Sequence, residues 1–254
     1  FTLELGISGA AIASSLAEMG SLIVLCIYTK AKIDKDKYGL KPVYDGRLLI
    51  KVLNLSVWSM LHAFISVAPW FLFFVAIEHL GKTELAISNI TRSVSAIFFV
   101  IANSFAVTTG SLVSNVIGAG ARNELFPICH KVLKLGYAVG IPFVVVALLC
   151  NRWIVSFYTD NELLIELAFA PFVVMILNYT FALPGYVYLN AVGGTGKNKI
   201  TFLFQVTTTC VYLVYLYWLS FCIKASLSLY LTAEYLFVIL LALQSIIYLK
   251  SKHY

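Results

Sequence analysis

Four ionisable side chains lie inside long apolar stretches of the sequence. Glu18 and Glu234 carry carboxylates that could bind a proton or a metal cation, and His62 carries an imidazole that titrates near neutral pH. Arg92 carries a permanent positive charge. Because a charge is costly to bury in apolar surroundings, each is a candidate for handling ions. The alternative is a hydrogen bond to a neighbouring segment or, for Arg92, a position near the aqueous boundary.

Aromatic and neutral amide side chains form a second set, which could bind an organic molecule. The stretch 84–117 carries too many Asn, Ser and Thr side chains to face an apolar environment, so it is expected to face other protein or a water-filled cavity. Aromatic faces combined with amides suit amphipathic organic cations, and helix packing is the alternative. The candidates for lining such a cavity are Trp58, Trp70, Asn89, Arg92, Asn103, Asn178 and Tyr179.

No motif in the sequence indicates an enzyme or a bound metal. The stretch GGTGK at 193–197 lacks the first Gly of a phosphate-binding loop and the Ser or Thr that follows its Lys. The five cysteines have no CxxC spacing and lie in or beside apolar runs, which is typical of small buried residues. We therefore predict that the chain is not an enzyme and that it holds no metal or cofactor.

The elements that must position these side chains are predicted to cross a membrane. Of the 254 residues, 61% are apolar and only 12% are charged, whereas soluble proteins average about 45–50% and 25%. A helix crosses a bilayer with about 20 apolar residues, and the stretches are too continuously apolar for barrel strands. The sequence predicts an all-α, polytopic membrane protein with seven spans, at 6–29, 50–78, 84–117, 124–150, 162–190, 198–223 and 226–249.

Local signals within these spans predict kinks and one helix start. Pro69, Pro142 and Pro184 lie inside spans and are kink candidates, and Pro184 is the strongest because Gly185 follows it. Thr159 with Glu162 three residues later is typical of a helix start, with Thr159 as the capping residue.

The basic residues indicate how the spans are oriented. If the first, third and fifth connections and the C-terminus lie on one side, that side holds 14 of the 18 Lys and Arg residues. Lys and Arg prefer the cytoplasmic side of a membrane, so the C-terminus is predicted to be cytoplasmic and the N-terminus external. The net charge of +6 then reflects orientation, and nucleic acid is not expected as a partner.

Four segments resemble a known family. They are GISGAAIAS at 6–14, EHLGKTELAISNI at 78–90, LVSNVIGAG at 112–120 and NAVGGTG at 190–196. In this order and at these spacings they resemble parts of the multidrug and toxic compound extrusion (MATE) transporters. The matching parts are the start of the sixth helix, the turn between the seventh and eighth, the end of the eighth, and the turn between the tenth and eleventh. The resemblance covers essentially the whole chain.

The resemblance implies that the chain corresponds to helices six to twelve of a twelve-helix transporter with two six-helix lobes, and that the first five helices are missing from it. Residues 1–29 would be the last helix of the N-terminal lobe, 30–51 a basic cytoplasmic loop between the lobes, and 52–254 the C-terminal transport lobe. The whole protein would be a monomer in a bacterial plasma (inner) membrane. It would export drugs or other organic compounds by antiport with H⁺ or Na⁺, through alternating access.

One departure from the family concerns the coupling ion. Sodium-coupled members carry an acidic residue in the seventh helix and another in the tenth, whereas the neighbourhoods at 62–64 and 178–182 hold no carboxylate. Coupling to H⁺ or Na⁺ would then rest on the N-terminal lobe or on groups in this chain. The ion-coupling candidates in this chain are Glu18 and His62.

Three other functions stay open at this stage. A flippase for lipid-linked oligosaccharides or peptidoglycan precursors would share the fold, but its pyrophosphate substrate calls for several Arg residues and the spans offer only Arg92. A seven-helix receptor fits the orientation, although a retinal protein would need a Lys inside the last span, where none lies between Lys224 and Lys250. A membrane scaffold that transports nothing is the third.

The coupling hypothesis predicts the effect of two substitutions. Glu18→Gln and His62→Ala in the intact transporter should each alter the pH or Na⁺ dependence of efflux, because each removes a group that can exchange an ion. The measurement is the rate of dye efflux against pH and Na⁺ concentration. If neither substitution alters it, the coupling site lies elsewhere.

Overall fold

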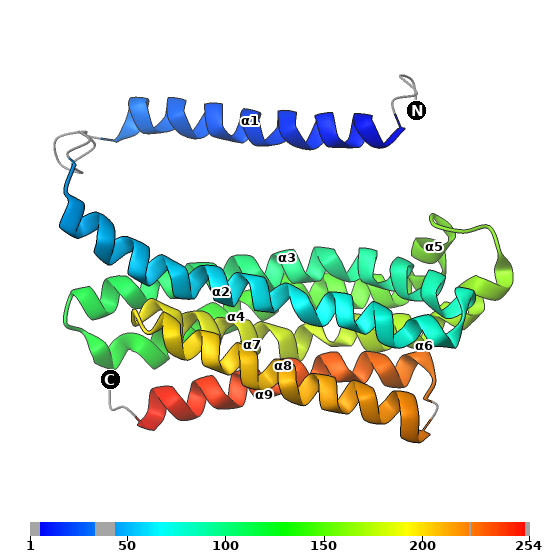
Figure 1. Ribbon diagram of the computed structural model, residues 1–254. Helices are drawn as coiled ribbons and strands as arrows, with labels where there is room; N and C mark the ends of the chain where they lie inside the picture. The colour runs from blue at the N-terminus through cyan, green and yellow to red at the C-terminus, as the bar shows by residue number, and fades with distance from the viewer. Residues whose placement is uncertain (1–5, 34–43, 224, 252–254) are drawn as a thin grey trace. The chain divides into compact units, whose positions relative to one another are not determined.

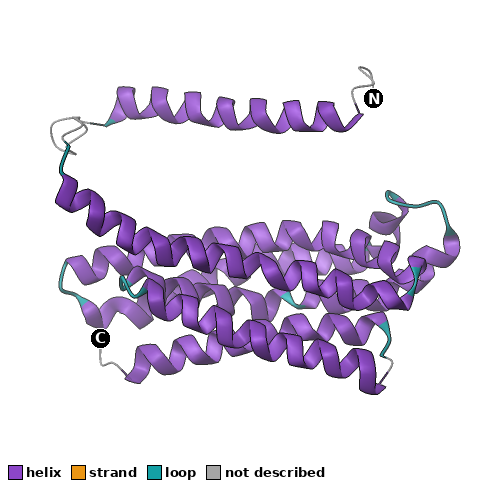
Figure 2. Ribbon diagram, in the orientation of Figure 1, coloured by secondary structure: helices purple, strands orange, loops and turns teal. Residues whose placement is uncertain are grey.

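The described part of the protein is a set of helices. The structure, a computed structural model, describes residues 6–33, 44–223 and 225–251, and within these ranges every regular element is a helix (Figures 1 and 2). Seven helical segments are long and apolar enough to cross a membrane. The all-α fold class and the seven spans predicted from the sequence are therefore confirmed.

The chain divides into two compact units, at 1–51 and 52–254, which are described separately. The first unit holds helix α1, Gly6–Lys32, and the start of α2. Glu18 lies near the middle of α1, where its side chain is exposed within this unit. Of the basic connection predicted at 30–51, residues 34–43 lie outside the described residues, and its assignment as an inter-lobe loop stays a prediction.

The second unit contains the remaining helices, which lie side by side with roughly aligned axes (Figure 1). Short 3₁₀ turns at Glu78–Leu80 and Arg122–Glu124 and a π-helical turn at Leu219–Ile223 join some of them. The helices are α2 (Gly46–Ile77), α3 (Lys82–Gly118), α4 (Leu125–Leu149), α5 (Asn151–Ser156), α6 (Glu162–Leu177), α7 (Tyr179–Gly194), α8 (Asn198–Trp218) and α9 (Leu227–Ser251).

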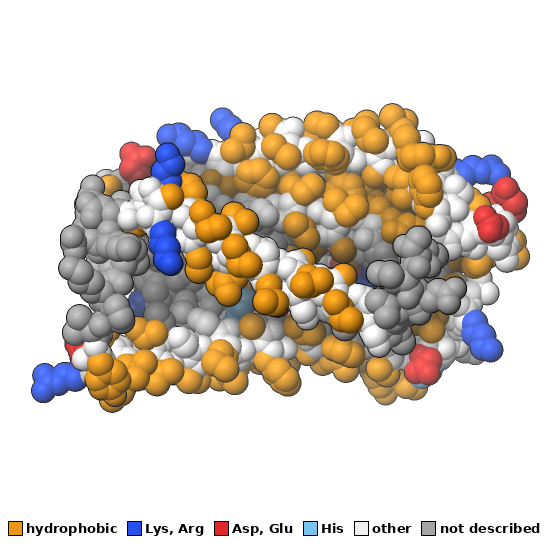
Figure 3. Space-filling view, turned by 90° about the horizontal axis from the view of Figure 1, so that it is seen from above, with side chains coloured by type: hydrophobic (Ala, Val, Ile, Leu, Met, Phe, Trp, Pro, Cys, Tyr) orange, Lys and Arg blue, Asp and Glu red, His pale blue; other side chains and the backbone are white. Residues whose placement is uncertain are grey.

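The surface has the pattern that a bilayer requires. Large apolar side chains are exposed along the helices, among them Phe143 on α4 and Val214 on α8. In the face shown in Figure 3, hydrophobic side chains are spread along the helices, whereas most of the Lys, Arg, Asp and Glu side chains lie towards the two ends. Because lipid tails are apolar, this surface is stable in a bilayer and would not be stable in water.

Helix α7 packs against α3 on one side and α9 on another. Its approach to α3 is close because both helices carry glycine there. A Cβ atom added at Gly194 would lie 2.4 Å from the carbonyl oxygen of Gly110, and one added at Gly110 would lie 3.1 Å from the carbonyl oxygen of Asn190. Small residues at this contact therefore let the two backbones meet, as they do at many helix interfaces in membranes.

The fifth predicted span is divided into α6 and α7 at Asn178, and Pro184, the strongest kink candidate, lies within α7. A proline cannot donate to the carbonyl four residues earlier, which here belongs to Thr180. Tyr137 on α4 supplies the missing donor, because its hydroxyl donates to that carbonyl at 2.7 Å. Tyr179 returns a hydrogen bond of 2.7 Å to the carbonyl of Gly136 on α4. Two tyrosines thus link α4 to the start of α7.

Helices α2 and α4 continue through Pro69 and Pro142, and a kink at either proline stays a prediction. The predicted start of α6 needs a correction. Helix α6 is capped by Asn161, whose side chain accepts from the backbone N–H of Leu163 at 3.0 Å, and not by Thr159. The hydroxyl of Thr159 instead accepts from the backbone N–H of Asn161 at 3.2 Å, so it shapes the turn that precedes the helix.

The glycine contact between α3 and α7 predicts a loss of stability on substitution. Gly194→Ala should lower the free energy of unfolding by about 1–3 kcal/mol, because the new methyl group meets a backbone carbonyl that cannot move away cheaply. Gly118→Ala is the matched control, since nothing lies within 4 Å of its added Cβ. Denaturant unfolding in detergent micelles checks both, and equal effects of the two substitutions would contradict the close approach.

Candidate functional site

A buried ion pair joins α3 to α9 in the second unit. The Nη2 atom of Arg92 donates to Oε1 of Glu234 at 2.7 Å, and the two side chains are only 4% and 11% exposed. Two opposite charges in contact are far less costly to bury than either alone, so each offsets part of the cost of burying the other. Arg92 is therefore in the interior, which contradicts the alternative of a position near the aqueous boundary with its head in water.

Aromatic side chains of α2 surround the cation of this pair. The guanidinium carbon of Arg92 lies 4.1 Å from the ring centre of Phe73, 5.1 Å from that of Trp70 and 5.4 Å from that of Phe74. We call these three rings the aromatic cage. All three distances are within the range of cation–π attraction.

The carboxylate of the pair has a second hydrogen-bond donor. The hydroxyl of Tyr212 on α8 donates to Oε1 of Glu234 at 3.3 Å. On the other side of the pair, Nε and Nη1 of Arg92 are buried and have no hydrogen-bond partner among the described residues. Donor groups left in this state are destabilising, which makes the site costly to maintain for packing alone.

A cavity of about 390 Å³ lies against Glu234. Its size is that of pockets that take small organic molecules. We call it the central cavity. Its wall combines aromatic, amide and apolar side chains from α2, α3, α7, α8 and α9, namely His62, Ser66, Val67, Pro69, Trp70, Phe99, Asn103, Tyr186, Leu189, Asn190, Gln205, Glu234 and Phe237.

A smaller cavity adjoins the central cavity and reaches the other half of the ion pair. The two share Trp70, Phe99, Tyr186 and Glu234. Asn178 also lines the smaller cavity; it is 8% exposed, and its Oδ1 atom has no hydrogen-bond partner in the part of the chain that the structure describes. Its remaining wall is formed by Arg92, Ser95, Phe98, Met175, Tyr179 and Ala182.

The structure brings together most of the residues singled out in the sequence. His62, Trp70 and Asn103 line the central cavity. Arg92, Asn178 and Tyr179 line the smaller one, so that six of the candidates lie around one ion pair. What each of them contributes to function stays a prediction.

Three candidates lie elsewhere. Trp58 lies about 18 Å along α2 from Trp70, at 1.5 Å per residue. Its ring contacts that of Phe202, with 5.6 Å between the ring centres. Asn89 is exposed near the start of α3 and lines neither cavity. Glu18 belongs to the first unit.

Sequence reasoning named Glu234 as a candidate for handling ions but did not assign it to the cavity, and it selected neither Tyr186 nor Gln205 as a site residue. Glu234 was visible as a carboxylate within the last span, but its partner Arg92 is 142 residues away along the chain. An amide such as Gln205, which is 2% exposed within an apolar helix, was an available signal. Tyr186 carried no signal, since tyrosines are frequent throughout this chain.

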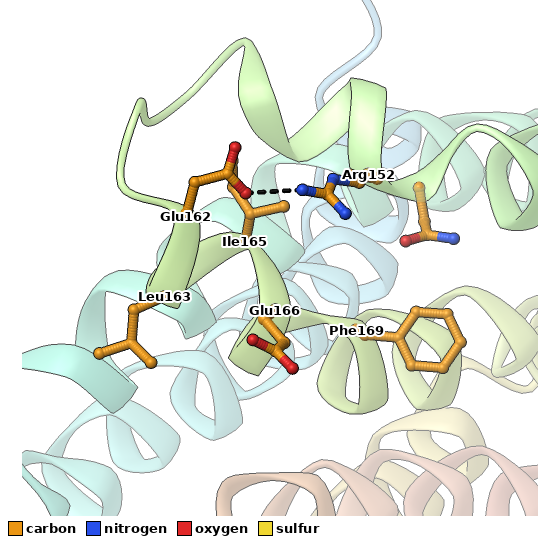
Figure 4. A pocket seen from close by; sticks show the side chains of 7 residues that line it. Arg152, Glu162, Leu163, Ile165, Glu166 and Phe169 are labelled. Carbon is orange, nitrogen blue, oxygen red and sulfur yellow. Dashed lines mark hydrogen bonds and ion pairs between the residues drawn. The ribbon is translucent and has the colours of Figure 1, made fainter.

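A third hollow, of about 580 Å³, lies at the end of the helices where α5 meets α6 (Figure 4). Figure 4 shows Arg152 facing Glu162 across it, and their ion pair is also 2.7 Å long. Both side chains are about three-quarters exposed, at 76% and 75%. This exposed pair provides a control for the buried one.

The fold and the site define a class of protein: a polytopic membrane protein with a cavity between its spans that is lined by aromatic, amide and apolar side chains. Comparison with known proteins then identifies the family, because the MatE family model matches residues 59–219, well over half of the chain. The chain belongs to the MatE family, whose members are transporters and not enzymes. The resemblance stated from the sequence is confirmed. No curated protein sequence matches the chain.

Solved structures agree on the fold. A crystal structure of MATE in complex with MaL6 superposes with a TM-score of 0.81 at 17% identity, covering 99% of this chain and 58% of that one. A crystal structure of MATE in the bent conformation superposes with a TM-score of 0.70 at 17% identity, covering 80% of this chain and 45% of that one. A MOP superfamily transporter from Pyrococcus furiosus superposes with a TM-score of 0.65 at 16% identity, covering 77% of this chain and 43% of that one. The chain thus spans about half the length of these transporters.

The buried ion pair predicts that removing its Arg lowers the free energy of unfolding far more than removing the Arg of the exposed pair does. Arg92→Ala should lower the free energy of unfolding by about 3–5 kcal/mol, because it leaves Glu234 buried without its partner. Replacing both residues by apolar ones, with Arg92→Met and Glu234→Leu, should recover most of that loss. Arg152→Ala, at the exposed pair, should cost about 0–1 kcal/mol. Denaturant unfolding of the four proteins measures this, and a loss for Arg92→Ala no larger than for Arg152→Ala would contradict it.

Proposed function

We propose that this chain is the C-terminal part of a secondary active transporter that exports drugs or other organic compounds in exchange for H⁺ or Na⁺. The observation that supports this proposal best is the central cavity. It is enclosed by five helices of a MatE-family lobe, and its wall offers aromatic faces and amides. Such a wall can bind organic compounds by stacking and hydrogen bonding without requiring one fixed geometry.

The mechanism we propose is alternating access. The two lobes of the whole transporter would rock about a site near the middle of the membrane, which opens to one side and then the other. Several features of the second unit support its movement as one body: the glycine contact of α3 with α7, the tyrosine links of α4 to α7, and the ion pair of α3 with α9.

We further propose the placement of the protein in the cell. It would be a monomer in the plasma (inner) membrane of a bacterium with the C-terminus in the cytoplasm, and it would need no cofactor besides the coupling ion and no nucleic acid. The distribution of Lys and Arg along the sequence supports this orientation. Glu18 and His62 remain the proposed ion-coupling residues of this chain.

The flippase alternative is less well supported. A pyrophosphate needs cationic side chains that are free to bind it. Arg92 is the one Arg or Lys residue that lines either of the two adjoining cavities, and it is paired with Glu234. The Pyrococcus furiosus transporter is described as having a binding pocket of reverse polarity that suggests a different function, so pockets of this fold can differ in charge.

Export can be tested with fluorescent dyes of different charge. Cells that express the transporter should export at least one of cationic ethidium and uncharged N-phenyl-1-naphthylamine, and dissipating the H⁺ and Na⁺ gradients should abolish the export. Phe99→Ala should slow export several-fold, because it removes an aromatic face shared by the two cavities. Phe143→Ala is the control, since that ring is exposed on α4 and lines neither cavity. Accumulation of both dyes regardless of the ion gradients would refute the proposal.

A further inference from the structure

The groups around Arg92 are those that recognise a free cation. Glu234 supplies a carboxylate, Tyr212 fixes that carboxylate through its hydroxyl, and the aromatic cage supplies three ring faces. A carboxylate beside several aromatic faces is the chemistry by which proteins bind guanidinium and ammonium ligands. In this structure the cation in that position is a side chain of the protein itself.

A free cation competes poorly with such an occupant. Arg92 is held at Glu234 by the backbone of α3, so its effective concentration there is on the order of mM or more, without any loss of the freedom to diffuse. The pair is neutral as a whole and lies in an apolar interior. Na⁺ or an organic cation would have to displace the guanidinium and leave it buried without a partner, which is strongly unfavourable.

An anion also finds no free partner at this site. Among the described residues, Arg92 is the one Arg or Lys on either cavity wall, and its Nε and Nη1 atoms, which do not bond Glu234, are buried. Apart from Glu234 and His62, the side chains that line the central cavity are amide, hydroxyl, aromatic or aliphatic. The wall therefore offers a charged ligand no unpaired Arg, Lys, Asp or Glu side chain.

We propose that Arg92 is a built-in cation that fills the cation site of this lobe, so that the central cavity takes an uncharged, ring-containing molecule. The rings of Trp70, Phe99 and Tyr186 would stack on the ligand, and the amides of Asn103 and Gln205 would bind its polar atoms. That this molecule is the transported one rests on the proposed export function. The binding itself does not, and it can be measured without transport.

The test uses three probes of one shape that differ in charge: uncharged 2-naphthamide, cationic 2-naphthamidinium and anionic 2-naphthoate. Their affinities are measured by equilibrium dialysis with the purified protein in lipid nanodiscs. The wild type should bind 2-naphthamide at least 10-fold more tightly than either ion. Exchange of K⁺ for Na⁺ at constant ionic strength should leave these affinities unchanged.

Two substitutions should change the charge preference of the site in opposite directions, one towards a cation and the other towards an anion. Arg92→Ala empties the aromatic cage and frees Glu234, so it should raise the affinity for 2-naphthamidinium at least 10-fold, and adding Glu234→Gln should abolish that gain. Glu234→Gln alone frees Arg92 and should raise the affinity for 2-naphthoate at least 10-fold. Arg152→Ala, which breaks the exposed pair, should change none of the three affinities.

Several outcomes would overturn this proposal. One is a wild type that binds 2-naphthamidinium as tightly as 2-naphthamide, another is a wild type that binds none of the probes, and a third is a folded Arg92→Ala protein that gains no affinity for the cation. If Arg92→Ala does not fold, the wild type and Glu234→Gln decide the question. The proposal then requires that Glu234→Gln gain affinity for 2-naphthoate. Failure of dye export while these charge preferences hold would refute the transport function alone.

Discussion

The arrangement of the second unit depends on how one buried positive charge is stabilised. Arg92 is buried in the second unit, where an unpaired guanidinium would cost several kcal/mol. Its stabilisation requires the carboxylate of α9, the rings of α2 and, through Glu234, the hydroxyl of α8. Four helices are therefore positioned by a single side chain, and the cavities lie beside it because its partners form part of their walls.

In the second unit, a backbone carbonyl that loses its helical hydrogen bond receives another donor, just as the buried charge receives a partner. Within a bilayer, a carbonyl that loses its helical partner needs another donor from the protein. Pro184 creates such a carbonyl at Thr180, and the hydroxyl of Tyr137 satisfies it. The result is that the fifth span stays anchored to α4 just after the boundary between α6 and α7 at Asn178, beside the smaller cavity.

The spans could be predicted from the sequence because a bilayer imposes length and hydropathy on each helix separately. The site could be predicted only in part, because it depends on which helix faces meet. Asn103 and Asn178 were recognisable as costly in apolar stretches, and both line a cavity. The pairing of Arg92 with Glu234 was not recognisable, since it depends on contact between α3 and α9. Trp58 was grouped with Trp70 by residue type, although one helix cannot bring both to the same cavity.

The tyrosine links between α4 and α7 have a consequence for how related sequences vary. Both hydroxyls donate to backbone carbonyls, which every residue possesses, so neither bond depends on the side chain at the accepting position. Position 180 is therefore free to change while position 137 stays Tyr, and the two need not covary across homologous sequences. Position 136 differs, because a Cβ atom there would lie 2.8 Å from Leu183. An inference of contacts from covariation would thus overlook one of the links that hold this lobe together.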